Sequence, residues 1–367
     1  MCPTWYAGSW DSWPNLLLGP ILWCSRKKAN RLRQERLQAN PCSNRPSSRF
    51  SSRLSRCSNL CNKNSIPHNR NSNPCRNKCN PKLTDMASQA QSLGMKGPIG
   101  VFDSGYGGLT ILRQIRNLMP QYDYVYLGDN ARAPYGTRSF ELVYEFTLQA
   151  VKHLFAQGCP LVILGCNTAS AKALRTIQQK DLPELDAARR VLGVIRPTAE
   201  SVGALTQSRH VGVVATPGTI KSHTYELEIA KLYPDVVVTG EACPMWVPLV
   251  ENYEYDGSGA DYFVKKSLDH LMSRDPQIDC LILGCTHYPL LMDKIKKYIP
   301  SGVRIMPQGD YVASSLKCYL ERHPEMQERL SQGGKILYHT TEQADVFQLS
   351  ASVFMGQEVT AERVLLQ

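Results

Sequence analysis

The sequence lacks several features that would assign it at once to a functional class. No apolar run in the chain approaches the ~18 residues that a membrane-spanning helix needs. The chain has no G-x-x-x-x-G-K-[ST] motif, and the glycines of "DSGYGG" do not fit the dinucleotide pattern G-x-G-x-x-G. After residue 95 there is no His-x-x-x-His pair or clustered set of acids for a metal, and no lysine stands out as a Schiff-base partner. We therefore expect no membrane span, nucleotide, metal or covalent cofactor.

Excess positive charge is also absent after residue 95, although the whole chain carries a net charge of +10. Residues 1–95 hold 15 Lys/Arg and 3 Asp/Glu, whereas the other 272 residues hold 27 and 29. The first segment is rich in Asn, Ser, Arg and Pro and has no apolar periodicity, so it cannot bury enough surface to offset chain entropy. We predict a basic, disordered leader over residues 1–94.

Several functions for the leader stay open. "WPNLLLGPILWCSRKK" resembles a signal peptide, but its positive charges follow the apolar run when they should precede it. The Arg- and Ser-rich, acid-poor composition suits a transit peptide. "CSNLC" and "CRNKC", with His68 between them, form a weak zinc pattern, and the basic charge is compatible with nucleic acid. We prefer the interpretation that translation starts at Met86 or Met95.

From Pro98 onward, apolar runs alternate with helical patterns. We predict strands at "PIGVFD", "YDYVYLGD", "LVILGC", "RVLGVI", "HVGVVAT", "DVVVTGEAC", "CLILGC" and "KILYHTT". The spacing predicts helices over residues 109–119 and 138–158, among others. Continuous apolar strands that alternate with helices are typical of an α/β fold with largely parallel sheets. "LVILGCNTAS" and "CLILGCTHYP" are alike, and so are "GVFDSGYGGLTI" and "GVVATPGTIKS", which indicates two similar α/β domains.

Two cysteines occupy matching positions in this pattern. Cys166 and Cys285 each follow a predicted strand, where open α/β sheets bind ligands. We expect each at the start of a helix, where free backbone N–H groups favour a thiolate. The other four cysteines after residue 95 lack this setting and are interpreted as structural, namely Cys159, Cys243, Cys280 and Cys318. Their lack of a regular framework suits a reducing, cytoplasmic compartment.

Further polar residues follow the predicted strands and suit a small ligand that bears carboxylates. They are Asp103, Ser104, Asp129, Tyr135, Gly136, Asn167, Thr168, Thr216, Thr219, Thr286 and His287. Ser and Thr at such places are also ordinary helix N-caps. For each of these residues taken singly, we therefore prefer a capping role to a ligand contact.

Six motifs together resemble the glutamate racemases, a cofactor-independent branch of the aspartate/glutamate racemase superfamily. They are "GVFDSGYGGLTIL", "GDNARAPYG", "LGCNTAS", "ATPGTIKS", "ACPMWVPLVE" and "LGCTHYPLL". The resemblance covers residues 95–367. It implies two α/β domains with the active site in a cleft between them, a first domain of residues 95–195 plus 305–367 and a second of residues 196–304. It also implies interconversion of L- and D-glutamate, supply of D-glutamate for peptidoglycan, and no cofactor or metal.

The same resemblance implies the roles of individual residues. Cys166 and Cys285 correspond to the two catalytic thiols, and Asp103, Glu251 and His287 to groups that help them transfer protons. The substrate-binding positions are Asp103, Ser104, Tyr135, Gly136, Asn167, Thr168, Thr216, Thr219, Thr286 and His287. The chain departs from the family pattern at Met245, Trp246 and Asn252, close to Glu251.

The chemistry suits two thiols, because inversion removes a proton from one face of an α-carbon and returns one to the other face. We expect glutamate as the small-molecule partner, a homodimer, and no membrane or nucleic-acid partner. Three alternatives stay open at this point: a sister racemase for aspartate, hydantoin or maleate, a Cys285–His287 hydrolase, and a binding module whose leader contacts nucleic acid.

Overall fold

The structure is a computed structural model, and it describes residues 96–366. The predicted leader, its cysteine pairs and His68 lie outside the described residues. Within residues 96–366, no helix is both long enough and apolar enough to cross a membrane.

Ten strands form two sheets in which all strand pairs within the described part of the chain are parallel. The first sheet has the order β10-β9-β2-β1-β3-β4 and the second has the order β6-β5-β7-β8. The strands are β1 Ile99–Asp103, β2 Tyr124–Gly128, β3 Leu161–Leu164, β4 Arg190–Gly193, β5 His210–Ala215, β6 Val237–Ala242, β7 Cys280–Gly284, β8 Arg304–Met306, β9 Ile336–Thr340 and β10 Ala361–Arg363. The parallel α/β prediction is confirmed.

The helices fill the connections between strands. The longer ones are α3 Gly108–Leu118, α4 Phe140–Ala156, α8 Ile195–Val202, α10 Thr224–Leu232, α12 Ser258–Arg274, α14 Gly309–Arg322 and α16 Ala344–Met355. The shorter ones are α5 Asn167–Lys172, α6 Leu174–Thr176, α7 Leu182–Leu185, α9 Pro217–Lys221, α11 Trp246–Glu251, α13 Met292–Tyr298 and α15 Pro324–Gln327. Among residues 96–366 there are also two 3-10 turns, η3 Asn130–Arg132 and η5 Tyr288–Leu291, and a π-helical turn, η4 Ile177–Asp181.

The central strands β1, β2 and β3 of the first sheet are buried on both faces, and this explains their continuous apolar runs. In β1, Ile99 and Val101 pack with α3, α14 and α16, while Phe102 packs on the opposite face with α4. The strands β2 and β3 alternate between the same two cores. The second sheet repeats this arrangement, since Val211 and Val213 of β5 face a core with α8 and α10, while Val214 faces one with α12.

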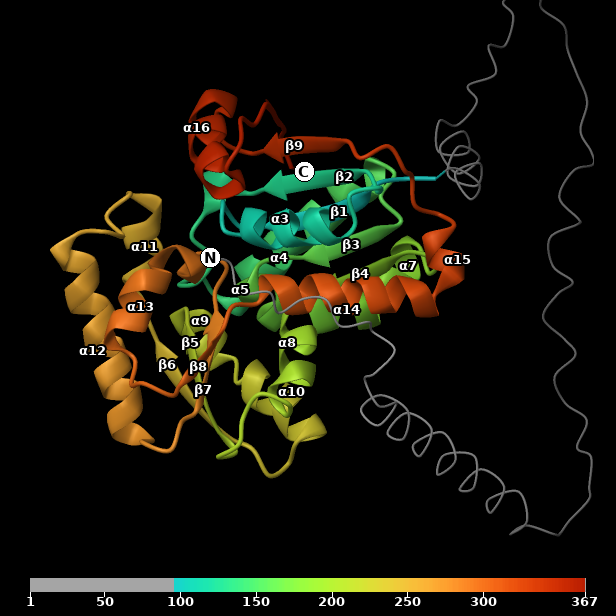
Figure 1. Cartoon of the computed structure of the whole chain (residues 1–367). Helices are drawn as coiled ribbons and strands as arrows, with labels where there is room; N and C mark the ends of the chain where they lie inside the picture. The colour runs from blue at the N-terminus through green and yellow to red at the C-terminus, as the bar shows by residue number, and fades with distance from the viewer. Residues whose placement is uncertain (1–95, 367) are drawn as a thin grey trace, which may run out of the picture. The chain divides into compact units, whose positions relative to one another are not determined.

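The chain end returns to the first sheet. Strand β9 pairs with β2 and then with β10, so the red end of the chain lies beside the blue-green start in Figure 1. The predicted domain boundary at residue 305 falls inside β8, which pairs with β7 in the second sheet. The exact domain limits therefore stay a prediction.

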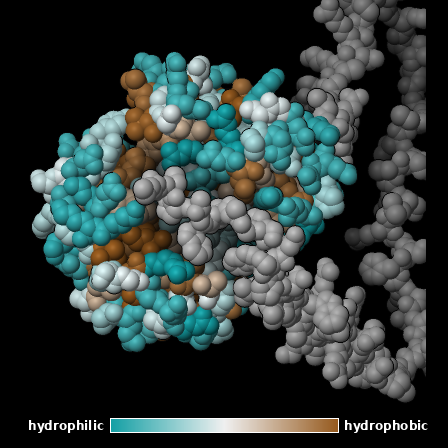
Figure 2. Space-filling view, viewed as in Figure 1, coloured by the Kyte–Doolittle hydropathy of each residue, from teal (hydrophilic) through white to brown (hydrophobic). Residues whose placement is uncertain are grey.

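On the face shown in Figure 2, most of the described surface is hydrophilic, with hydrophobic residues gathered in separate patches.

Candidate active site

Cys166 lies buried between β3 and α5. Its Sγ accepts a hydrogen bond from the backbone N–H of Ala169 at 3.4 Å, so Cys166 caps α5 as predicted. The Ser104 Oγ lies 3.3 Å from the same sulfur. Burial raises the pKa of the Cys166 thiol to about 12, and the neighbouring Asp103 carboxylate adds to the rise. The expected lowering by the helix end is therefore outweighed by burial, and the thiol is protonated at neutral pH.

Asp103 ends β1 and is only 1% exposed. Its Oδ2 accepts a hydrogen bond from the Gly105 N–H at 2.9 Å, whereas its Oδ1 has no hydrogen-bond partner among the described residues. Burial raises the pKa of this carboxyl, and the charge of His287 opposes part of the rise. A buried polar atom without a partner is uncommon in folded proteins.

Cys285 follows β7 but does not begin a helix, so that expectation was wrong. The chain makes a turn after Gly284, and η5 starts only at Tyr288. The Cys285 Sγ lies 3.8 Å from the Nδ1 of His287, and the Nε2 of that ring lies 3.1 Å from the Glu251 Oε1. Cys285 thus has an imidazole beside it in place of a helix end.

The imidazole of His287 is almost fully buried, at 5% exposure. Burial alone would lower its pKa, but hydrogen bonds to Cys285 and Glu251 outweigh this and raise the pKa to about 10. His287 therefore carries a proton at neutral pH. The departure from the family pattern at Trp246 does not displace Glu251, because Trp246 is buried against the ring of Tyr288 while Glu251, at the end of α11, still reaches His287.

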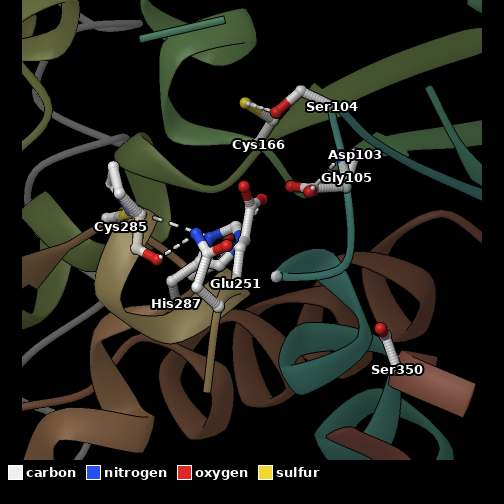
Figure 3. A network of polar contacts seen from close by, with 12 residues as sticks. Asp103, Ser104, Gly105, Cys166, Glu251, Cys285, His287 and Ser350 are labelled. Atoms are coloured by element: carbon white, nitrogen blue, oxygen red, sulfur yellow. Dashed lines mark hydrogen bonds and ion pairs between the residues drawn. The ribbon is translucent and has the colours of Figure 1, made fainter. Parts of the chain in front are cut away.

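The loop after β1 brings the two cysteine segments into one site. A Cβ on Gly107 would lie 2.5 Å from the His287 Nδ1 and closer still to the Thr286 Oγ1, so only glycine fits there. The Thr110 Oγ1 lies 3.1 Å from the Thr286 carbonyl oxygen. Figure 3 shows Ser104 beside Cys166 on one side of this region, with Cys285, His287 and Glu251 on the other. The charge of Cys285 is also among the influences that raise the Cys166 pKa.

Three threonine hydroxyls lie within hydrogen-bond distance of one another. The Thr168 Oγ1 lies 3.0 Å from that of Thr216 and 3.3 Å from that of Thr219, and the latter two are 3.1 Å apart. Thr168 belongs to α5, whereas Thr216 and Thr219 lie at the start of α9. The Gly218 N–H donates to the Gly136 carbonyl oxygen at 2.8 Å, so the loop around Gly136 also reaches this cluster.

Tyr135 turns its side chain away from the threonines. Its hydroxyl donates to the Asp129 carboxylate, and its ring packs with Phe102 and Phe146 in the core beneath α4. Asp129 also binds the Arg132 guanidinium, at 2.7 Å. Contact of Tyr135 with a ligand would therefore come through its backbone.

The structure adds buried polar residues that the sequence did not single out. They are Tyr225 on α10 and Gln308, which directly precedes α14, and both are hydrogen bonded to Asn167. Gln308 follows the short strand β8, and recognition of that strand would have placed it at the same sheet edge as the other candidates. Tyr225 carries no such signal, because it lies one residue inside an ordinary helix.

None of the other four cysteines in residues 96–366 follows the carboxyl end of a strand as Cys166 and Cys285 do, except Cys243, which follows β6. Cys159 and Cys280 are fully buried, and burial raises the pKa of each to about 12. Cys243 is also buried and Cys318 is exposed. No group of three or more His, Cys, Asp or Glu side chains in residues 96–366 is placed to hold a metal ion.

Comparison with known proteins places this chain in a family. The model of the Asp/Glu/Hydantoin racemase family matches residues 109–311. A glutamate racemase of Ruegeria sp. (strain TM1040) is 41% identical over 277 residues, which cover 72% of this chain and 98% of that relative. A glutamate racemase of Exiguobacterium sibiricum is 37% identical over 273 residues, which cover 74% and 97%.

Solved structures agree with these relatives. A glutamate racemase isoform of Bacillus anthracis matches with a TM-score of 0.67 and 34% identity, over 74% of this chain and 98% of that one. The Francisella tularensis glutamate racemase in complex with D-glutamate matches with a TM-score of 0.66 and 33% identity, over the same shares. The sequence motifs, the paired parallel sheets and these matches lead to one conclusion: the chain belongs to the Asp/Glu/Hydantoin racemase family, among the glutamate racemases.

Proposed function

We propose that this protein interconverts L- and D-glutamate by moving the α-proton between two thiols, Cys166 and Cys285, without a cofactor. The observation that carries the proposal is the arrangement of the thiols. Each follows the carboxyl end of a strand in a different sheet, each has its own polar partner, and the Gly107 loop brings both segments together. The relatives named glutamate racemase support the choice of substrate.

The reaction needs one base and one acid on opposite faces of the α-carbon. The thiolate of one cysteine takes the α-proton and becomes a thiol, and the electron pair of the broken C–H bond stays on a planar carbanion. The thiol of the other cysteine then gives its proton to the opposite face and becomes a thiolate. One proton leaves the substrate and one enters it, so the two cysteines have exchanged states, and the reverse reaction starts from that exchanged pair.

The polar residues suit the charges that a bound amino acid would bring. The free Oδ1 of Asp103 can accept a hydrogen bond from the substrate ammonium group. We assign Asn167, Thr168 and Thr286 to the α-carboxylate, where hydrogen-bond donors stabilise the developing carbanion. Thr216, Thr219 and the backbone at Gly136 provide further carboxylate contacts. His287 and Glu251 assist Cys285, and Ser104 assists Cys166.

The biological role follows from the same proposal. D-glutamate is a building block of peptidoglycan, and the matching relatives come from bacteria such as Streptococcus agalactiae. We propose that the enzyme acts in the cytoplasm as a homodimer. The free thiols of all six cysteines in residues 96–366 support a reducing compartment.

A substrate comparison tests the proposal. The purified full chain, without added cofactor, is incubated with D-glutamate, D-aspartate or a hydantoin. Circular dichroism follows the loss of ellipticity as each substrate racemizes. We expect racemization of glutamate, and racemization of only one of the other two would assign the chain to a sister activity. A variant that lacks residues 1–94 is expected to remain active, whereas loss of function on this deletion would favour the leader as the functional part.

A further inference from the structure

Directly behind the Cys166 segment, three buried side chains close a ring of hydrogen bonds. The Tyr225 hydroxyl lies 2.7 Å from the Asn167 Oδ1, the Asn167 Nδ2 lies 2.5 Å from the Gln308 Oε1, and the Gln308 Nε2 lies 2.7 Å from the Tyr225 hydroxyl. The exposure of Asn167 is 3%, and Tyr225 and Gln308 are each 2% exposed. We call Asn167, Gln308 and Tyr225 the amide ring.

A fourth residue sets the direction of donation around the ring. The Thr198 hydroxyl donates to the Val194 carbonyl at 2.8 Å, so its oxygen is left to accept from the Gln308 Nε2 at 2.9 Å. Gln308 therefore points its NH₂ group toward Thr198 and Tyr225, and its carbonyl toward Asn167. Tyr225 accepts from Gln308 and donates to the Asn167 carbonyl oxygen.

This direction fixes which group Asn167 can offer to a ligand. Its carbonyl oxygen is engaged by Tyr225, and one of its two Nδ2 hydrogens is engaged by Gln308. Among the described residues, the second Nδ2 hydrogen has no acceptor. Asn167 is thus held as a donor, and a donor suits a carboxylate oxygen and disfavours an ammonium group.

Tyr225 also touches the other thiol segment. A Cβ on Gly284, the residue before Cys285, would lie 3.2 Å from the Tyr225 Cε2 and 3.0 Å from the Ala215 Cβ. The tyrosine ring thus packs against the backbone that leads into Cys285, while its hydroxyl binds the residue that follows Cys166. A single side chain connects the ends of β3 and β7.

We propose that Tyr225 and Gln308 are positioning residues that hold the Asn167 amide as a carboxylate donor and fix the Cys166 segment relative to the Cys285 segment. This inference rests on the proposed racemase activity. It assigns no proton transfer to Tyr225 itself. Removal of its hydroxyl should weaken catalysis because it leaves the Asn167 carbonyl unpaired and free to turn toward the substrate carboxylate.

The test is a double-mutant cycle on glutamate racemization with the full chain. We expect Tyr225→Phe to lower kcat/KM about 10- to 100-fold, with a rise in KM that a purely structural change would not give. In the Asn167→Ala background, the added Tyr225→Phe should change kcat/KM less than about 2-fold. Losses that multiply in the double variant, or a Tyr225→Phe enzyme with unchanged kcat/KM, would overturn the proposal.

Two further variants separate positioning from loss of stability. Tyr124→Phe is the matched control, because the buried Tyr124 hydroxyl donates to the Met119 carbonyl at 2.6 Å outside the site. It should lower Tm, because a buried hydrogen bond is lost, and leave kcat/KM unchanged. If Tyr225→Phe fails to fold, Thr198→Val provides the test, with an expected loss of about 2- to 10-fold that disappears in the Asn167→Ala background. An inactive wild-type enzyme would refute the racemase proposal itself. An active wild-type enzyme with an unimpaired Tyr225 variant would refute only the positioning role.

Discussion

The two thiol segments share a sequence pattern but differ in their surroundings. Cys166 caps a helix, has a serine hydroxyl beside it, and has its pKa raised to about 12 by burial. Cys285 follows its strand into a turn and lies beside His287, whose own pKa is raised to about 10 by its hydrogen bonds to Cys285 and Glu251. The repeated Leu-Gly-Cys motif therefore predicts where the two thiols lie, but the surroundings of the two thiols differ.

The difference comes from residues outside the repeat. Ser104 comes from the loop after β1, and Glu251 comes from the end of α11. The two thiols therefore have unlike partners, a serine hydroxyl beside Cys166 and an imidazole beside Cys285.

Removal of either sulfur is the largest change that can be made to this pair. We expect Cys166→Ala and Cys285→Ala each to lower racemization by at least about 10³-fold, because each face of the α-carbon needs its own proton carrier. Each variant keeps one thiol, which can still remove and return a proton on its own face. In deuterated water, NMR should therefore show α-deuterium entering one enantiomer in Cys166→Ala and the opposite enantiomer in Cys285→Ala. Full racemization by either variant would exclude that cysteine from the reaction.

The next largest effect is expected from the imidazole that distinguishes the Cys285 side. His287→Asn should lower kcat/KM about 10²- to 10³-fold. The loss must be the same from L- and from D-glutamate, since the equilibrium constant between enantiomers in achiral solvent is one. Coupled assays in both directions check this. An activity within 3-fold of wild type would show that the two thiols do not need unlike partners.

The same histidine also predicts how stability depends on pH. Its pKa is raised in the folded protein from 6.5 to about 10, so its proton stabilises the folded state below pH 6.5. This contribution is lost as the pH rises through about 10. We expect the Tm difference between wild type and His287→Asn to be largest near pH 6 and to shrink toward pH 10. A difference that grows with pH would contradict the raised pKa.

A smaller effect is expected from the loop that joins the two sides. Gly107→Ala should lower kcat/KM about 10²-fold, because its Cβ would displace Thr286 and His287 and small misplacements are costly in a catalytic site. Gly105→Ala is the matched control, since its Cβ would make an ordinary contact with the Glu251 Oε1, at 3.4 Å. Steady-state kinetics should show the control within about 3-fold of wild type. Equal losses in both variants would mean that the loop tolerates no side chain at all.

The smallest effect on activity is expected at Tyr135. Tyr135→Phe removes a hydroxyl that binds Asp129 on the side away from the threonines. We expect kcat/KM to change less than about 3-fold, while the free energy of unfolding falls by ~1–3 kcal/mol, because the buried Asp129 loses a partner. Urea unfolding and a racemization assay measure the two effects. A large rise in KM with unchanged stability would instead place the hydroxyl on the substrate.

Much of the fold could be predicted from the sequence, because strands that are buried on both faces give unbroken apolar runs. The central strands β1, β3, β5 and β7 are of this kind. The strands β8 and β10 were missed, since each has only three residues and both are partly exposed, with no apolar run.

The site was predictable where it depends on the ends of central strands, and less so elsewhere. Cys166 and Cys285 follow strands with clear patterns, and Asp103 ends one. The turn after Cys285 was missed because the sequence that follows it is compatible with an α-helix. In the structure a short 3-10 turn, η5, begins only at Tyr288. Tyr225 was missed because its partner Asn167 lies 58 positions away, and no local pattern records such a contact. Gln308 was missed together with the short strand β8 that it follows.

Conversion of L-glutamate in deuterated water, followed by NMR and chiral analysis in the first turnovers, tests the central claim most directly. If the two thiols lie on opposite faces, the thiol that gives the proton has exchanged with solvent. The D-glutamate formed should then carry deuterium at its α-carbon from the start, while the remaining L-glutamate still carries hydrogen. D-glutamate that keeps the original α-hydrogen would show one base that serves both faces, and would contradict the two-thiol account.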